Sequence, residues 1–252
     1  KACHEHIMGM FMDDADGEVI IKWMAHNVQK PGEKILWAPI VLGVQGDGMT
    51  TLGRMLSAAM GARHVENVGV KEVFSPFSGW ASGACVGIIE EIRVTGHMRS
   101  DAMDTLKPFI TNATVNVVRK GSDGIDVLNT QNYMAFTNHP DALMLGKDDR
   151  RWGVFATRYE SREELVRHRD ESYWEWLYSL INDGAGDIRG WLMSIDLKGF
   201  NPAQAPVCNQ AKLNMIKESV SDDASNIMEI LEELEIDGEP INVFTTAYVN
   251  QT

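Results

Sequence analysis

Short apolar runs along the chain are separated by segments in which apolar residues recur at helical spacing. The runs predict buried strands at residues 35–42, 84–89, 133–136 and 153–157. The helical spacing predicts helices at residues 17–27, 51–60 and 98–109. Strands that are apolar throughout and alternate with helices are typical of an α/β fold, a parallel sheet flanked by helices on both faces.

After residue 160 the pattern changes, because apolar residues recur only at helical spacing. Helices are predicted at residues 163–169, 173–182, 188–193, 211–219 and 224–234. We therefore expect a core over residues 1–160, with a short helical lead-in at 1–33. A helical C-terminal region over residues 161–252 is expected to pack against that core.

One pair of short segments differs from the buried runs. Residues 115–118 and 125–128 flank Arg119-Lys-Gly-Ser-Asp-Gly124, a turn that carries glycines and two basic residues. Such a turn between two β-forming segments predicts an antiparallel hairpin.

The loop after the first apolar run carries the most specific chemistry. Gly43-Val-Gln-Gly-Asp-Gly-Met-Thr-Thr51 matches the phosphate-loop pattern G-x-x-x-x-G-K-[ST] except at the lysine, where Met49 stands. Glycines in such a loop let consecutive backbone N–H groups point at phosphate oxygens at a helix N-terminus. An ordinary glycine-rich turn is the alternative interpretation. The residues expected to bind the phosphates are Gly43, Gly46, Asp47, Gly48, Met49, Thr50 and Thr51, with the Thr50 hydroxyl on Mg²⁺.

Polar residues also end two later apolar runs. Glu90 and Glu91 close Val86-Gly-Ile-Ile and fit a Walker B motif, in which the first acid orients Mg²⁺ and the second polarises the attacking water. Asn138 follows the run at 133–137 and is placed to hydrogen-bond a γ-phosphate or the attacking water. The alternatives are solvated acids at a strand end and an asparagine that only forms a turn before His-Pro.

Two adjacent arginines form the last candidate element. Arg150 and Arg151 follow Asp148 and Asp149. An arginine here is suited to reach a phosphate in a neighbouring subunit as an arginine finger, with Arg150 as the first choice. A surface ion-pair cluster of the four side chains is the alternative.

Composition limits the classes of function. The 252 residues carry a net charge of −13, which argues against a generally basic nucleic-acid-binding surface but not against a local basic channel. No apolar run approaches a membrane span, so no membrane partner is expected. Three widely spaced cysteines fit a reducing cytoplasm. Cys3, His4 and His6 are a possible metal cluster, but an incidental grouping is the preferred interpretation.

Taken in order, these elements resemble a superfamily 3 helicase, the compact AAA+ ATPase type of viral and phage replication proteins. The resemblance rests on the glycine loop, the Glu-Glu strand, the basic hairpin, the strand ending in asparagine and the paired arginines. Phage and plasmid primase-helicase proteins are the most similar members. The resemblance covers roughly residues 15–220, with the motifs between 43 and 152.

The resemblance implies a ring, usually a hexamer of identical subunits, that binds ATP and Mg²⁺ between subunits and translocates on single-stranded DNA. It places Arg119 and Lys120, assisted by Lys107, in a pore where basic side chains track phosphates. It implies a location in the cytoplasm, that of the host cell if the protein is phage-encoded. Because the chain begins at Lys1, we expect a fragment of a longer protein, with a primase or polymerase domain before it.

Met49 is the departure from this pattern. The missing lysine would bridge the β- and γ-phosphates, so we expect weakened nucleotide binding and largely lost hydrolysis. A deliberate substitution, natural loss of hydrolysis, or another cation such as Lys147 in the lysine's place would each account for it. A non-catalytic ring or DNA-binding module is the competing function, and a packaging ATPase or clamp loader is a third.

Overall fold

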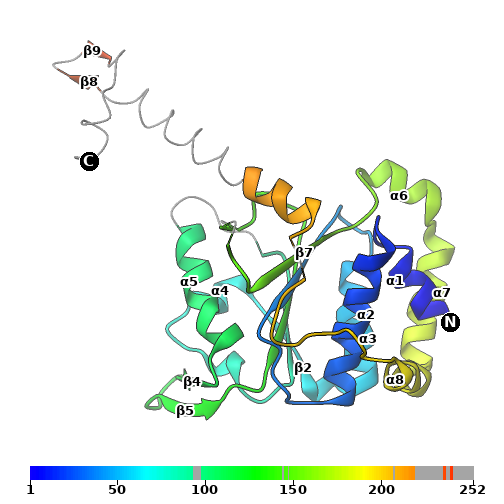
Figure 1. The fold of residues 1–252 in the computed structure, drawn as a ribbon, viewed down its shortest axis with the longest axis horizontal. Coiled ribbons are helices and arrows are strands. Elements are labelled where there is room, and N and C mark those ends of the chain that lie inside the picture. The colour runs from blue at the N-terminus through cyan, green and yellow to red at the C-terminus, as the bar shows by residue number, and fades with distance from the viewer. Residues whose placement is uncertain are drawn as a thin grey trace.

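A computed structural model describes residues 1–92, 98–143, 145–146, 148–206, 208–218, 235–236 and 239–240. It confirms the α/β prediction: a parallel sheet forms the centre and helices cover both of its faces (Figure 1). The predicted helix at 224–234 lies outside the described residues.

The central sheet has five strands in the order β2-β3-β6-β1-β7, all parallel to their neighbours. β1 lies between β6 and β7, with Ile40 opposite Ala135 on one side and Val154 on the other. Because the strands are parallel, their carboxyl ends meet at one edge of the sheet. The strands span β1 Ala38–Leu42, β2 Val65–Val68, β3 Val86–Ile89, β6 Asn132–Thr137 and β7 Trp152–Ala156.

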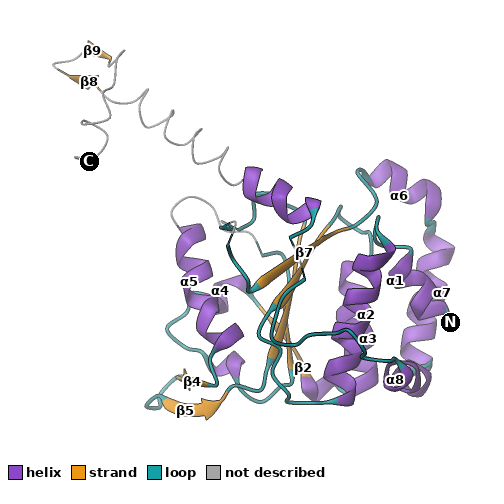
Figure 2. Ribbon diagram, in the orientation of Figure 1, coloured by secondary structure: helices purple, strands orange, loops and turns teal. Residues whose placement is uncertain are grey.

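The helices form two layers around this sheet (Figure 2). One layer contains α2, α3, α7 and α8, and the other contains α4 and α5. The helices span α1 Ala2–Met8, α2 Asp14–Gln29, α3 Met49–Met60, α4 Val70–Val73, α5 Met98–Thr111, α6 Arg162–His168, α7 Glu171–Asp183 and α8 Ala185–Ser194. Two 3-10 turns, Ala62–His64 and Gly79–Ala81, and a helical segment at 210–218 complete the described helices.

Each face of the sheet has its own hydrophobic core. On the α2 and α3 side, Trp23, Met55 and Phe155 are fully buried. On the α5 side, Leu106, Tyr133 and Trp152 fill the equivalent space. All four residues of β3 and all six of β6 are buried, which explains why these strands are apolar on both faces apart from Asn132 and Thr137 at the two ends of β6.

Most predicted elements form within a few residues of the expected limits. The first strand is shorter than its apolar run, because Ile35 and Trp37 pack into the core before β1 begins at Ala38. The sequence pattern does not predict α1, a short helix whose Cys3, His6 and Ile7 are buried. It also predicts no element at residues 66–73, where the structure forms β2 and α4.

The predicted hairpin is confirmed as β4 (Thr114–Val117) paired antiparallel with β5 (Ile125–Leu128). It lies near the starts of the sheet strands, since Asn129 N–H donates to the Ala113 carbonyl three residues before β6. Lys34 holds the base of the hairpin in place, because its Nζ donates to the Phe109 carbonyl at 2.7 Å and to Asn129 Oδ1 at 3.2 Å.

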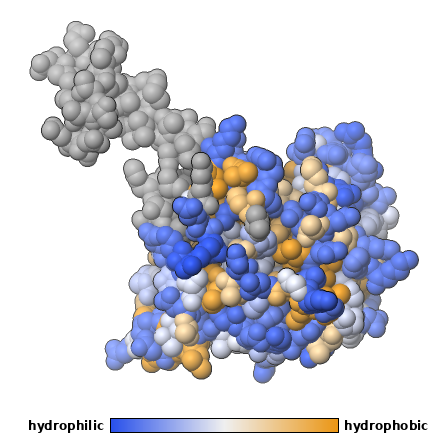
Figure 3. Space-filling view, viewed as in Figure 1, coloured by the Kyte–Doolittle hydropathy of each residue, from blue (hydrophilic) through white to orange (hydrophobic). Residues whose placement is uncertain are grey.

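The outer surface in the view of Figure 3 is largely hydrophilic, with apolar areas at the end that carries β4 and β5. Ile125 and Leu128 of the hairpin contribute large exposed apolar side chains. Among the helices in the described ranges, none has the length and apolar character needed to span a membrane.

Candidate functional site

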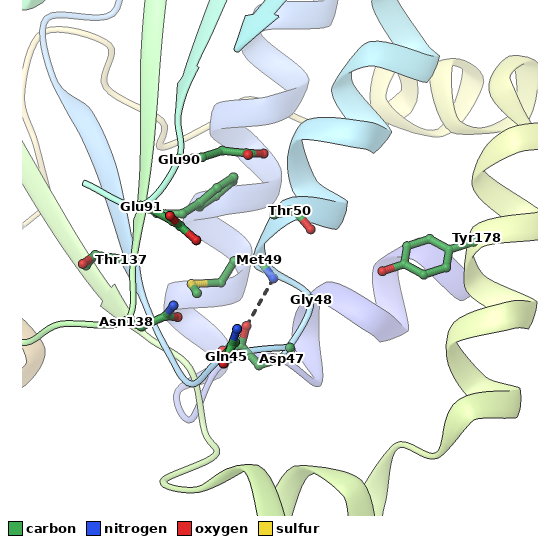
Figure 4. Close-up of a pocket in the computed structure, with 12 residues that line it drawn as sticks. Gln45, Asp47, Gly48, Met49, Thr50, Glu90, Glu91, Thr137, Asn138 and Tyr178 are labelled. Carbon is green, nitrogen blue, oxygen red and sulfur yellow. Dashed lines mark hydrogen bonds between the residues drawn. The ribbon is translucent and has the colours of Figure 1, made fainter. Parts of the chain in front are cut away.

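A pocket of about 170 Å³ lies at the carboxyl ends of β1, β3 and β6 (Figure 4). This is the edge where open α/β sheets bind ligands. The pocket brings together three of the segments singled out in the sequence: the glycine loop, the Glu-Glu strand end and Asn138. Its lining consists of Gln45, Gly46, Asp47, Gly48, Met49, Thr50, Glu90, Glu91, Phe136, Thr137, Asn138 and Tyr178.

The loop between β1 and α3 depends on two glycines with positive φ. Gly46 has φ of 90° and Gly48 has φ of 98°, a region that residues with a Cβ rarely occupy. Gly48 is the N-cap of α3, and the helix begins at Met49. The N-terminus of α3 therefore faces the pocket with the positive end of its helix dipole, an arrangement suited to an anion.

The carboxylate of Asp47 holds this loop together from inside. Asp47 is buried; its Oδ2 accepts a 2.7 Å hydrogen bond from the Thr157 hydroxyl and its Oδ1 accepts one from Met49 N–H. Burial raises the pKa of the Asp47 carboxyl, which these hydrogen bonds partly offset. The carboxylate of Asp47 thus supports the loop from inside, and Asp47 also lines the pocket.

Thr50 and the two glutamates give the pocket a side suited to a cation. The Thr50 hydroxyl makes no hydrogen bond within the described part of the chain, and Thr50 is exposed. Glu90 lines the same pocket and also the neighbouring one, again together with Thr50. A hydroxyl and a carboxylate fit Mg²⁺, which usually takes one or two protein oxygens and completes its shell with phosphate and water.

Glu91 has a strained backbone at the end of β3. Its φ of 52° is the one positive value among non-glycine residues of the described chain. Such a conformation costs on the order of 1 kcal/mol and is concentrated at functional sites. Glu91 lies on the same side of the pocket as Asn138 (Figure 4).

Met49 occupies the centre of the pocket. Its side chain extends from the start of α3 toward Glu91 and Asn138 (Figure 4), and it is 7% exposed. Met49 also packs with the core on the α3 side of the sheet. A lysine at this position would have the reach to place its ammonium between the loop and the acidic strand end.

A buried hydrogen-bond chain lies behind the loop, and it includes residues the sequence analysis did not recognise as linked. His6 Nδ1 lies 2.6 Å from the Tyr173 hydroxyl and His6 Nε2 lies 2.9 Å from Thr51 Oγ1. Because the Thr51 hydroxyl donates to the Gly48 carbonyl, His6 Nε2–H must donate to Thr51 and Nδ1 must accept from Tyr173. Thr51 is therefore buried and committed to this chain, outside the pocket lining.

The protonation of His6 should make the fold sensitive to acid. Burial, with Arg169 as a smaller cause, lowers the pKa of His6 to about 3. Below pH 6.5 the unfolded chain binds a proton that the folded chain excludes, so the free energy of unfolding decreases as the pH is lowered. We expect this group to remove about 2 kcal/mol of unfolding free energy between pH 7 and pH 5, measured by urea denaturation.

The control for this prediction lies on the same helix. His4 is exposed, so His4→Gln should keep the pH dependence of the unmodified chain. His6→Gln should lose the part of it that His6 contributes, whatever its absolute stability, and keep the part that comes from His26, whose pKa burial also lowers. An unchanged pH dependence in His6→Gln would contradict the assignment.

Arg169 is a second buried residue that supports the loop. It is 6% exposed, and its guanidinium donates to the Asp47 carbonyl at 3.4 Å and to the His6 carbonyl at 3.3 Å. The rings of Tyr159, Tyr173 and Trp174 surround it at cation–π distance. The number of aromatic residues at 173–178 was the one sequence signal for the surroundings of Arg169, and that pattern predicted only a helix.

The remaining predicted residues lie away from the pocket. Arg150 is exposed and Arg151 half-buried, immediately before β7, at the edge of the sheet where the strands start. Within one chain they are on the opposite edge from Glu90 and Asn138, so a finger role requires a second copy. Lys147 lies outside the described residues.

The three basic candidates of the hairpin region are at the same edge as the arginines. Lys120 and Arg119 are exposed in the turn between β4 and β5, and Arg119 Nη2 donates to Ser82 Oγ at 3.1 Å. Lys107 is partly buried on α5 and pairs with Asp104. Of these, Lys120 is the one with no ion pair or hydrogen bond within the described residues.

Comparisons with known proteins agree with this fold. Residues 41–151 match a family described as a family of unknown function (DUF5906). A search among curated proteins found no match. A solved structure described as the apo structure of the NrS-1 C-terminal region (305–718) superposes with a TM-score of 0.73 at 20% identity, over 91% of this chain and 53% of that one.

An A form apo structure of the NrS-1 C-terminal region superposes with a TM-score of 0.71 at 17% identity, over 98% of this chain and 60% of that one. The chain thus spans a little over half the length of these solved structures. At such identities the likeness establishes a shared fold. The matched family segment begins within β1 and ends before β7, so it contains the whole predicted motif set.

Proposed function

We propose that this chain is the ATP-binding domain of a ring-forming, superfamily 3 DNA helicase from a phage-type replication protein. In this proposal it is an AAA+ P-loop NTPase that binds ATP and Mg²⁺ and acts on single-stranded DNA as a hexamer in the cytoplasm of the host. The pocket that joins the glycine loop to Glu90, Glu91 and Asn138 carries the proposal.

Each part of the pocket has a role in this chemistry. The N–H groups at the start of α3 hold the phosphates, and Thr50 with Glu90 would hold Mg²⁺, which offsets phosphate charge. Glu91 is suited to orient and deprotonate the attacking water, and Asn138 to hydrogen-bond the terminal phosphate. Arg150 and Arg151 lie at the opposite edge of the sheet from the pocket of their own chain. In this proposal, one of them would therefore act on the pocket of the next subunit.

A nucleotide-binding ring that does not hydrolyse ATP is the second candidate, and Met49 favours it. The buried thioether leaves the pocket without the cation that bridges the outer phosphates. Retention of Glu90, Glu91, Asn138 and Arg150 supports the helicase over this alternative.

Assembly on DNA tests the proposal. We expect negative-stain images of the chain with ATP, Mg²⁺ and single-stranded DNA to show rings. A strict monomer under all of these conditions would contradict the ring. Because Lys120 is exposed and has no ion pair among the described residues, Lys120→Ala should weaken DNA binding. It should also lower the slope of log affinity against log salt by about 0.7 for each phosphate that is no longer neutralised.

The matched control replaces an exposed lysine outside the hairpin. Lys198 is exposed in the segment after α8, so Lys198→Ala should leave both the affinity and the salt slope unchanged. Equal salt slopes for Lys120→Ala and the unmodified chain would remove the hairpin turn from the proposed DNA path.

A further inference from the structure

On the side opposite the acids, the pocket is lined by an aromatic residue of α7. Tyr178 of α7 lines the pocket and lies across the glycine loop from Glu90 and Glu91 (Figure 4). Its hydroxyl points toward the loop (Figure 4). None of the motifs found in the sequence includes this residue.

Close packing fixes α7 against the loop. A Cβ added to Gly48 would come within 2.7 Å of the Trp174 ring, so the loop backbone and this indole are in direct contact. Tyr178 lies one turn after Trp174 on α7, and Arg54 lies one turn after Thr50 on α3. The two helices thereby bring Tyr178 and Arg54 together beside the pocket.

Arg54 covers the Tyr178 ring, with the guanidinium carbon 4.6 Å from the ring centroid. Arg54 is exposed, and within the described residues it makes no ion pair or hydrogen bond. A cation–π contact at an exposed site is weak, so the guanidinium moves off the ring at low cost. A flat ligand can then enter between the two groups.

The chemistry at the two ends of the pocket determines how a nucleoside triphosphate would be oriented in it. Its terminal phosphate belongs beside Glu90, Glu91 and Asn138, where hydrolysis would occur. The phosphates then cross the N-terminus of α3, and the nucleoside leaves on the far side of Gly48 and Thr50. Tyr178 is the pocket residue on that side (Figure 4).

We propose that Tyr178 and Arg54 bind the nucleobase, with the phenol ring on one face of the base and the guanidinium on the other. This inference rests on the proposed nucleotide-binding function. Stacking accepts any base, because every base has a π-face. The site would therefore strengthen binding of nucleotides without selecting among them by hydrogen bonds.

Calorimetry with ATP and with inorganic tripolyphosphate, both with Mg²⁺, tests the assignment. Tyr178→Ala should weaken ATP binding about tenfold, within the range found for base–aromatic stacking, and leave tripolyphosphate binding unchanged. Tyr178→Phe keeps the ring and should bind ATP as the unmodified chain does. Trp176→Ala removes an exposed ring of the same helix outside the pocket and should change neither affinity.

The two ligands separate failure of this inference from failure of the proposed function. Equal ATP affinity in Tyr178→Ala and the unmodified chain, with tripolyphosphate still bound, overturns the nucleobase site and leaves the phosphate site intact. A parallel loss of both ligands in Tyr178→Ala would show a structural role and also overturn it. If neither ligand binds the unmodified chain or Met49→Lys, the nucleotide-binding function itself fails, and the inference with it.

Discussion

Replacing Met49 with lysine is expected to raise ATP hydrolysis by about a hundredfold or more, the size of effect seen when one charge-stabilising donor is restored to an active site. The side chain of Met49 already extends toward Glu91 and Asn138 and is 7% exposed (Figure 4). A lysine of similar length would place its ammonium where negative charge develops on the phosphates. Nucleotide affinity should rise about tenfold, as expected for one charge-assisted hydrogen bond.

Steady-state phosphate release, measured with DNA present, checks this prediction. Met49→Leu keeps an apolar side chain of similar volume and should stay at the low rate of the unmodified chain. Adding Glu91→Gln to Met49→Lys should abolish the increase, because the attacking water no longer has a base. Equal turnover in the unmodified chain and Met49→Lys would show that position 49 does not limit the reaction.

Gly43→Ala is expected to destabilise the fold by about 3 kcal/mol, at the upper end for overpacking of a tight site. A Cβ at Gly43 would lie 1.9 Å from Asp47 Oδ2 and 2.4 Å from Thr157 Oγ1. Both atoms belong to the buried hydrogen bond that closes the loop, so the methyl group must break it or displace the loop. Nucleotide binding should be abolished as well, because the loop N–H groups move.

The matched control is a glycine-to-alanine change in open space. Gly190 lies within α8, and no atom of the described residues is within 4 Å of an added Cβ. Gly190→Ala should stabilise the fold by up to about 1 kcal/mol through helix propensity. Urea unfolding at pH 7 distinguishes the two changes. A Gly43→Ala variant as stable as the unmodified chain would mean that Asp47 and Thr157 do not constrain the loop.

Much of the pocket follows from the order of residues alone. The glycine loop, Glu90 and Asn138 each come directly after an apolar run, and parallel strands place such positions at one edge. The strand pattern therefore predicted both the fold class and the meeting of these segments. The roles assigned to Glu90, Glu91, Asn138, Arg150 and Lys120 stay predictions for the experiments above.

Other features could not be found by pattern. His6, Arg169 and Tyr178 lie far along the chain from the loop that they contact or face. None of them belongs to a recognisable sequence motif. His6 and Tyr173, for example, are 167 positions apart and share a 2.6 Å hydrogen bond. The buried hydrogen bond between the Thr157 hydroxyl and the Asp47 carboxylate, two residues 110 positions apart, was likewise not predictable from the sequence.

There is a physical reason why some features could be predicted from the sequence and others could not. Local periodicity and glycine-rich turns depend on neighbouring residues, so the amino-acid sequence by itself determined the α/β class, the hairpin and the phosphate-loop pattern that lacks its lysine. Three features depend on how α1, α6 and α7 pack against α3. They are the position of Tyr178 in the pocket, the buried hydrogen bonds of His6, and the contact of Arg169 with the loop. Only the tertiary structure decided those, because contacts between distant segments depend on the shape of the whole core.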